Sequence, residues 1–219
     1  MSGLTITTAP ANEPLDAAET ISYLRLDSGV DTTLVNSLIQ AARFWCEDYT
    51  NRTLLTTTFT LSLNSIGEVD LPLKEGLHTG YSTPTRLNYI ELPKPPVQSV
   101  TSIISYNDEN TASTLDASNY YSDLVREPAR VVLRDGGSWP TDLRNANGIE
   151  VKYIAGYGDS RGAIPEPIRI AMLQYITFLY EHRGDFERFP PPKPPVSLQM
   201  LLQPYVIMRY GVSAFGGGY

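Results

Sequence analysis

The chain has 219 residues, of which 42% are apolar and 19% are charged, and its formal net charge is −7. This apolar content is enough to build a core, so the composition excludes wholesale disorder. The acidic balance disfavours a protein that reads nucleic-acid sequence, because such proteins need clustered lysine and arginine to displace counterions. The single cysteine, Cys46, excludes an intramolecular disulfide and a cysteine-based metal site.

The first 14 residues are expected to form a short flexible arm. They lack the basic start and the apolar stretch of a secretory signal. No stretch of the sequence approaches the roughly 18 uninterrupted apolar residues that are needed to cross a bilayer. The sequence therefore predicts no membrane partner.

Three segments place apolar residues at helical spacing, and they cover residues 16–26, 32–50 and 166–183. The second is the longest, and its apolar stripe is wide. Asp31 suits the N-cap of this helix, because an aspartate side chain can accept hydrogen bonds from the amides of the first turn. Asn51 can adopt the left-handed conformation that often ends a helix. We expect the three helices to pack together as a small bundle.

The end of the long helix is electrostatically unfavourable. Glu47 and Asp48 lie in its last turn, where the helix dipole disfavours negative charge. Local electrostatics therefore does not explain this helix end, and we expect tertiary packing to hold it. Cys46 lies beside them on the apolar stripe, so we expect it to be buried as a small hydrophobic residue.

Between the second and third helices, the apolar period changes from 3.6 to 2, which is typical of half-buried strands. Phe59, Leu61 and Leu63, for example, alternate with threonine and serine. Strands are expected at 56–63, 69–73, 87–92, 97–106, 119–124, 130–134 and 149–155. The sequence thus predicts an α+β fold, in which an antiparallel sheet, sandwich-like or barrel-like, is inserted at 56–156 into a domain covering 15–189.

Residues 190–219 are predicted to be an extended tail. The proline-rich stretch 189–195 cannot be helical and is expected to act as a stiff polyproline spacer. An apolar segment follows, and it needs somewhere to bury itself. It can dock on another subunit or protein, or it can fold back on its own domain. The candidate docking residues are Leu198, Met200, Leu201, Leu202, Tyr205, Val206 and Ile207.

No motif indicates catalysis, a cofactor or a metal. The glycines at 156, 158 and 162 lack the spacing of a dinucleotide-binding loop, and there is no phosphate-binding loop. The only histidines, His78 and His182, are far apart in the sequence and have no neighbouring acid/base constellation. The sequence therefore predicts a protein that is not an enzyme.

Several stretches, taken in order, resemble the head–tail connector (adaptor, or head-completion) proteins of long-tailed bacteriophages. The matching stretches are LDAAE at 15–19, YLRL at 23–26, LIQAAR at 38–43, EDYTNR at 47–52, LPKPPVQSVTSI at 92–103, VKYIAGYGD at 151–159, IPEPIR at 164–169 and LYEHR at 179–183. The ordered set of motifs covers about residues 15–186.

The resemblance implies a structural virion protein, made in the cytoplasm of a bacterial host and placed in the neck. It implies a ring, usually of twelve copies, that is mounted under the portal protein and offers a surface to the next stopper or tail protein. Double-stranded DNA would pass through the lumen without sequence-specific binding, and the ring would help to retain it. The chain departs from shorter family members in its large β insertion and in its tail.

Three hypotheses accompany this resemblance. The tail residues would bind the portal or a neighbouring subunit. Glu47 and Asp48 would lie at a subunit interface, where an arginine of the neighbouring copy could pair with them. The acidic composition would suit a lumen that repels phosphate, so that DNA leaves without sticking.

Two alternatives stay open at this point. The chain could form another neck or tail ring, such as a stopper or a tail terminator. It could also be a β domain whose tyrosine-rich loops bind a glycan or another ligand, although the acid/base cluster of an enzyme is missing.

Overall fold

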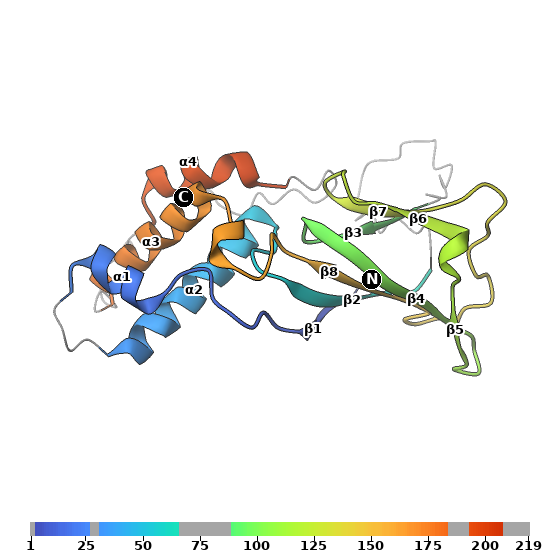
Figure 1. Ribbon diagram of the computed structural model, residues 1–219. Coiled ribbons are helices and arrows are strands. Elements are labelled where there is room, and N and C mark those ends of the chain that lie inside the picture. Colours follow the sequence, from blue (N-terminus) through green and yellow to red (C-terminus); the bar gives the residue numbers. More distant parts are fainter. Residues whose placement is uncertain (1–2, 27–30, 66–88, 184–192, 208–219) are drawn as a thin grey trace, which may run out of the picture. The chain divides into compact units, whose positions relative to one another are not determined.

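The computed structural model describes residues 3–26, 31–65, 89–183 and 193–207. The chain divides into two compact units. The sheet unit comprises Met1–Thr7, Thr58–Ile154 and Ile207–Tyr219, and the helical unit comprises Thr8–Thr57 and Ala155–Val206. Figure 1 shows the four α-helices of the helical unit and the strands of the sheet unit. The predicted α+β class is confirmed, and the strands that the structure describes form two sheets that do not close into a barrel.

The sheet unit contains a five-stranded and a three-stranded sheet. The order in the larger sheet is β1 (Gly3–Thr8), β2 (Thr57–Leu63), β8 (Ile149–Ala155), β4 (Val97–Tyr106) and β5 (Ala112–Thr114). The order in the smaller sheet is β3 (Tyr89–Leu92), β7 (Ala129–Leu133) and β6 (Tyr120–Asp123). Strand β7 pairs antiparallel with both of its neighbours. A short 3-10 helix, Ala117–Asn119, precedes β6.

Burial alternates along β2 and β8, as the sequence period predicts. In β8 the side chains of Ile149, Val151 and Tyr153 are buried, and the residues between them are not. The Tyr153 hydroxyl donates a hydrogen bond to the carbonyl of Pro93, which follows β3, at 2.8 Å. A strand of the larger sheet is thereby tied to the segment that leaves the smaller one.

The helical unit contains α1 (Ala17–Leu24), α2 (Thr32–Thr50), α3 (Glu166–Glu181) and α4 (Val196–Leu202), with 3-10 turns at Arg161–Ala163 and Gln203–Tyr205. The observed bounds of α2 are the predicted ones. Asp31 caps it by accepting a 2.8 Å hydrogen bond from the Thr33 amide. Asn51 ends it with a left-handed φ of 56°. Both predicted helix-end signals are thus confirmed.

One hydrophobic core fills the helical unit, and all four helices contribute to it. Its fully buried members include Ile39 of α2, Ile168 and Met172 of α3, and Leu198 and Leu202 of α4. Burying side chains of this size stabilises the fold by roughly 1.5–3 kcal/mol each before entropy costs. The core is therefore incomplete without α4.

A close approach of two chain segments closes this unit beside Gly156. The Tyr157 amide donates to the Leu54 carbonyl at 3.1 Å, and the Thr56 amide donates to the Gly158 carbonyl at 3.1 Å. Gly156 has a φ of 126°, and a Cβ added there would lie 2.4 Å from the Leu55 backbone. Only glycine fits this position.

Three observations correct the sequence analysis. Residues 3–8 form strand β1 and are not a free arm, because a run of β-branched residues can complete a sheet edge. Strand β5 was not predicted. Residues 196–202 form helix α4 inside the core of the helical unit, so this part of the tail is not an extended segment. The expected strand at 69–73 lies outside the described residues.

Candidate protein–protein interface of the helical unit

Helix α2 has two different faces. Val35, Ile39 and Cys46 point into the core and are almost fully buried. On the opposite side, Leu34 and Phe44 are 41% and 56% exposed. Ala41 and Asp48 are also exposed, and the four residues follow one another at helical spacings of seven, three and four positions. We call Leu34, Ala41, Phe44 and Asp48 the outward face of α2.

A buried arginine supports this helix from the side. Arg43 binds Glu13 through two hydrogen bonds, from Nε to Oε2 at 2.8 Å and from Nη2 to Oε1 at 3.2 Å. Its Nη1 donates to Oε2 of Glu47 at 3.2 Å. The other Glu47 oxygen accepts from the Leu54 amide at 2.9 Å. This network ties the segment before α1 and the turn after α2 to one guanidinium.

The charges in this network stabilise one another. Burial by itself lowers the pKa of Arg43, but the carboxylates of Glu13 and Glu47 more than offset this, so the pKa is raised. The guanidinium carbon also lies 4.4 Å from the centre of the Phe44 ring. Phe44 is thus held in place on the outward face by a cation beneath it.

The network explains how the chain accommodates an acidic residue, Glu47, in the last turn of α2. Glu47 has partners within its own chain, so an arginine from a neighbouring copy is not needed to explain it. Asp48 is exposed on the outward face. A contact of either residue with another subunit stays a prediction. The sequence analysis missed Phe44 and the Glu13–Arg43 pair, although Leu34 and Phe44 have the spacing that marks a second apolar line.

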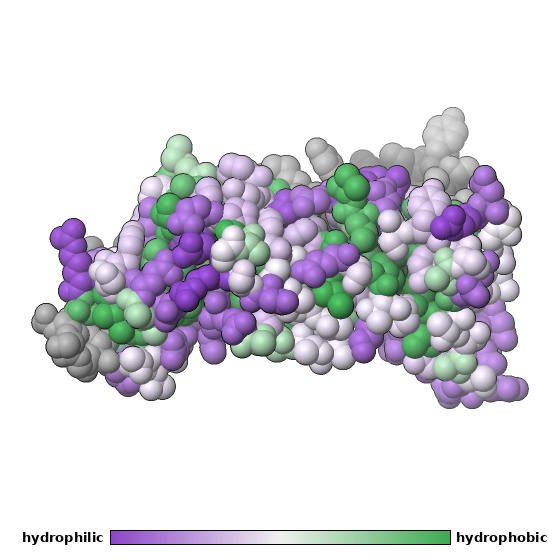
Figure 2. Space-filling model, viewed as in Figure 1, coloured by the Kyte–Doolittle hydropathy of each residue, from purple (hydrophilic) through white to green (hydrophobic). Residues whose placement is uncertain are grey.

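The structure separates the predicted tail residues into three groups by their burial. Leu198 and Leu202 have no exposed surface and belong to the core. Met200, in contrast, is 72% exposed, and Val196, one helical turn before it, is 68% exposed. Figure 2 shows apolar side chains among polar ones over the helices. The remaining candidates are half-buried, and they are Leu201, Tyr205, Val206 and Ile207.

The tail is also fixed by its backbone. Arg52 is buried, with an exposure of 7%, and its Nε donates a hydrogen bond to the Tyr205 carbonyl at 2.6 Å. Folding back on the chain's own domain, the second possibility for the tail, therefore holds for α4 and the turn after it. Docking on another protein is left to the outward residues Val196 and Met200, and it stays a prediction.

A ladder of stacked aromatic rings crosses from α2 to α3. Successive ring centres from Tyr49 through Trp45, Tyr175 and Phe178 to His182 lie 5.2, 4.5, 6.1 and 4.5 Å apart. Such pairs add about 0.5–1.5 kcal/mol each beyond their burial. The ladder therefore stabilises the packing of α2 against α3.

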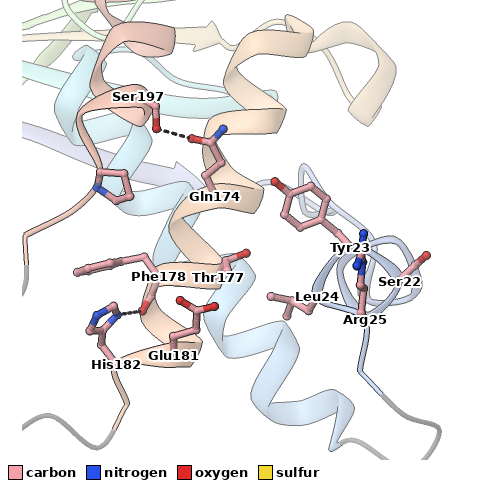
Figure 3. Close-up of a pocket in the computed structure, with 11 residues that line it drawn as sticks. Ser22, Tyr23, Leu24, Arg25, Gln174, Thr177, Phe178, Glu181, His182 and Ser197 are labelled. Carbon is pink, nitrogen blue, oxygen red and sulfur yellow. Dashed lines mark hydrogen bonds between the residues drawn. The ribbon is translucent and has the colours of Figure 1, made fainter.

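The ladder ends at an open groove of about 740 Å³ between the end of α1, α3 and the start of α4. Tyr23, Phe178 and His182 are among its lining residues. Figure 3 shows Ser197 hydrogen-bonded to Gln174, and His182 to the Phe178 carbonyl. The lining of the groove thus combines aromatic with polar and charged side chains.

Cys46 is not a reactive site. Burial, with a smaller effect of the Glu47 charge, raises the pKa of its thiol to about 12. Since the thiolate is the reactive form, we expect iodoacetamide at pH 8 to leave the folded chain unlabelled and to label it after unfolding in urea. Mass spectrometry measures both states. Rapid labelling of the folded chain would contradict the placement of Cys46 in the core.

The described residues contain no cluster of histidine, cysteine and acidic side chains that could hold a metal. No described helix is long and apolar enough to cross a membrane.

The fold is shared with proteins of particle necks. Chains from three solved structures match over 98% of this chain and 98% of their own length. They come from the neck of an empty gene transfer agent particle computed with C6 symmetry (TM-score 0.71, 22% identity), the virion of a native gene transfer agent particle (0.71, 20%) and the neck of a native particle computed with C12 symmetry (0.65, 19%). Neither a protein-family model nor a curated protein matches the sequence.

Proposed function

We propose that this chain is a structural subunit of a particle neck, where copies form a ring between the portal and the tail. The observation that carries the proposal is the likeness to neck chains over 98% of both lengths, in both units of the fold. The ordered connector motifs of the sequence support it independently. The proposed location is the neck of a virion.

The proposed ring has six-fold or twelve-fold symmetry, with twelve copies as the expectation from the connector resemblance. The related necks were computed with C6 and C12 symmetry. The outward face of α2 suits such a ring, because exposed Leu34 and Phe44 gain by being covered in a neighbour's surface. Asp48, on the same face, is the acidic residue that we propose to lie at this contact.

The ring would continue the DNA channel without binding DNA tightly. A net charge of −7 favours repulsion between the wall and phosphate, so that DNA slides past. A channel wall lined with lysine and arginine would contradict this part of the proposal.

We further propose that the outward side of α4 contacts the portal. Val196 and Met200 are the exposed apolar residues of this helix, and the core holds the opposite side in a fixed orientation. A preformed apolar surface binds with less loss of entropy than a free peptide does. Repetition around a ring then strengthens a weak contact. A neighbouring subunit is the other possible partner of this surface.

The portal contact can be tested with Met200→Glu, which places a charge on the exposed side of α4 without touching the core. We expect the variant to melt like the wild type and to lose attachment to tail-less heads in a head-completion assay, because burying an unpaired carboxylate is costly. Val125→Glu is the matched control, since Val125 is 96% exposed in the sheet unit.

The outcomes separate the possible partners. Attachment equal to that of the wild type would rule out the portal contact. Loss of ring assembly as well as attachment would assign the surface to the neighbouring subunit. Pull-down with portal and with tail-tube proteins separates an adaptor from a stopper or a tail terminator, because only an adaptor retains the portal.

A further inference from the structure

Strand β1 forms an uncovered edge of the larger sheet within the part of the chain that the structure describes. It is first in the strand order, so only β2 pairs with it there. Every residue except Leu4 is exposed, and Ile6 is 55% exposed. The strand is nevertheless well anchored on its inner side, because the Thr5 hydroxyl donates to the Thr60 carbonyl at 3.3 Å and the Thr7 and Thr60 hydroxyls lie 2.7 Å apart.

Among the described residues, this edge lacks the usual protection against pairing with another chain. Natural edge strands carry lysine, proline or a bulge, or they are covered by another element. The strand GLTITT has no charged residue and no proline, and four of its six residues are β-branched. It therefore combines high strand propensity with an open row of backbone groups, the feature on which strand addition depends.

The other edge of the same sheet has a similar character. Among the strands that the structure describes, β5 pairs with β4 alone, with Ser113 opposite Ser105. Its three residues are all exposed, and the stretch NTASTL at 110–115 has no charged residue and no proline. The Asn107 side chain fixes the turn before it by accepting from the Glu109 and Thr111 amides. One sheet thus ends in two different, uncharged edges.

We propose that β1 of one copy pairs with β5 of the next copy, so that the larger sheets of neighbouring subunits join into one continuous sheet. This inference rests on the proposed ring. A ring needs two different surfaces on each subunit that fit each other, and the two edges of one sheet supply such a pair. Pairing of β1 with β1 would use one surface twice and would stop at a dimer.

The proposed pairing is short, because β5 has three residues. A single junction is therefore weak, and a two-stranded contact of this length is not stable alone in water. Closure of the ring makes every junction intramolecular and raises its effective strength. The outward face of α2 in the helical unit can add a second contact in the same ring.

Thiol cross-linking tests the proposed junction. We combine Ile6→Cys on β1 with Ser113→Cys on β5 in the full chain and add a short bismaleimide at concentrations where the wild type associates, as measured by mass photometry. The buried Cys46 does not compete for the reagent. Controls are each single variant and the pair Val125→Cys with Ser113→Cys, since Val125 is more exposed than Ile6 but belongs to no strand.

The proposal predicts a ladder of covalent multimers for the Ile6/Ser113 pair and monomers for each single variant. Covalent dimers from Ile6→Cys alone would overturn it in favour of β1 pairing with β1. A ladder equally strong for the Val125 control, or no ladder from an associated sample, would also overturn it. In those cases a wild-type assembly of six or twelve copies leaves the proposed ring intact, whereas a monomer at every concentration contradicts the ring as well.

A lysine on the edge is a second, independent test. Ile6→Lys adds the charge with which natural edges block pairing, and we expect it to weaken self-association by about tenfold or more. The melting temperature should stay that of the wild type, because Ile6 is exposed in the isolated chain. Unchanged association would contradict the junction, and Val125→Lys controls for the added charge.

Discussion

Replacing Leu198 with alanine is expected to lower the free energy of unfolding of the helical unit by about 2–5 kcal/mol. Leu198 has no exposed surface and packs in the same core as residues of α2 and α3. Its removal leaves a cavity between helices that are far apart in the sequence, and neither can close it alone. The effect is large because α4 completes the core.

Tryptophan fluorescence can measure the stability of the helical unit separately, because the two tryptophans lie in different units. Trp45 lies in α2 of the helical unit and Trp139 lies in the sheet unit. In a Trp139→Phe background, fluorescence during urea unfolding therefore reports on the helical unit by itself. This separation is needed because a chain of two units need not unfold in one step.

Met200→Ala is the matched control for Leu198→Ala, since Met200 is on the same helix and 72% exposed. We expect it to change the free energy of unfolding by no more than about 0.5 kcal/mol. Equal effects of the two substitutions would mean that α4 does not pack as described. The same reasoning predicts that truncation before α4 destabilises the whole unit, so truncation is a poor test of docking.

Replacing Arg43 with methionine is expected to cost about 3–5 kcal/mol of stability, because it leaves the Glu13 and Glu47 carboxylates without their cation. The Arg43 side chain is 8% exposed and that of Glu47 is 14% exposed, so water replaces the lost contacts poorly. Methionine keeps the apolar stem, which isolates the effect of the charge. Trp45 fluorescence in urea measures the loss.

A double-mutant cycle shows whether the loss comes from the ion pair. We expect Arg43→Met combined with Glu13→Gln to be less destabilising than the sum of the two single substitutions, because the unpaired carboxylate is then absent. Additive effects would show that Arg43 is not coupled to Glu13, and would leave its pairing with Glu47 and its packing as the source of the loss. Arg183→Met provides the control of an exposed arginine, and we expect it to have little effect on stability.

The elements with strong local signals were predicted from the sequence. The bounds of α2 agree at both ends because Asp31 and Asn51 have clear capping chemistry. The strands β2 and β8 follow the apolar alternation closely. In these elements the local preference of the chain and its tertiary environment agree.

Two elements were missed although their signals were present. The residues of β1 are β-branched, but a strand at a chain terminus looks like an arm until its partner β2 is known. In α4, Leu198 and Leu202 have i, i+4 helical spacing. The prolines before them and the high apolar content favoured an extended docking peptide instead.

The candidate interface could be predicted only in part. The wide apolar stripe of α2 indicated contacts on more than one side, and the outward residues Leu34 and Phe44 agree with this. The Glu13–Arg43 pair could not be predicted, because 30 residues separate its partners and Glu13 belongs to no helix or strand. Contacts of this kind depend on the tertiary fold, which local patterns do not specify.

Cryo-electron microscopy of particles that carry this chain tests the central proposal most directly. We expect density that fits both units of the chain in a closed ring of six-fold or twelve-fold symmetry, located in the neck between the portal and the tail. Density for the chain elsewhere on the particle, or in the neck without a closed ring, would contradict the proposed function.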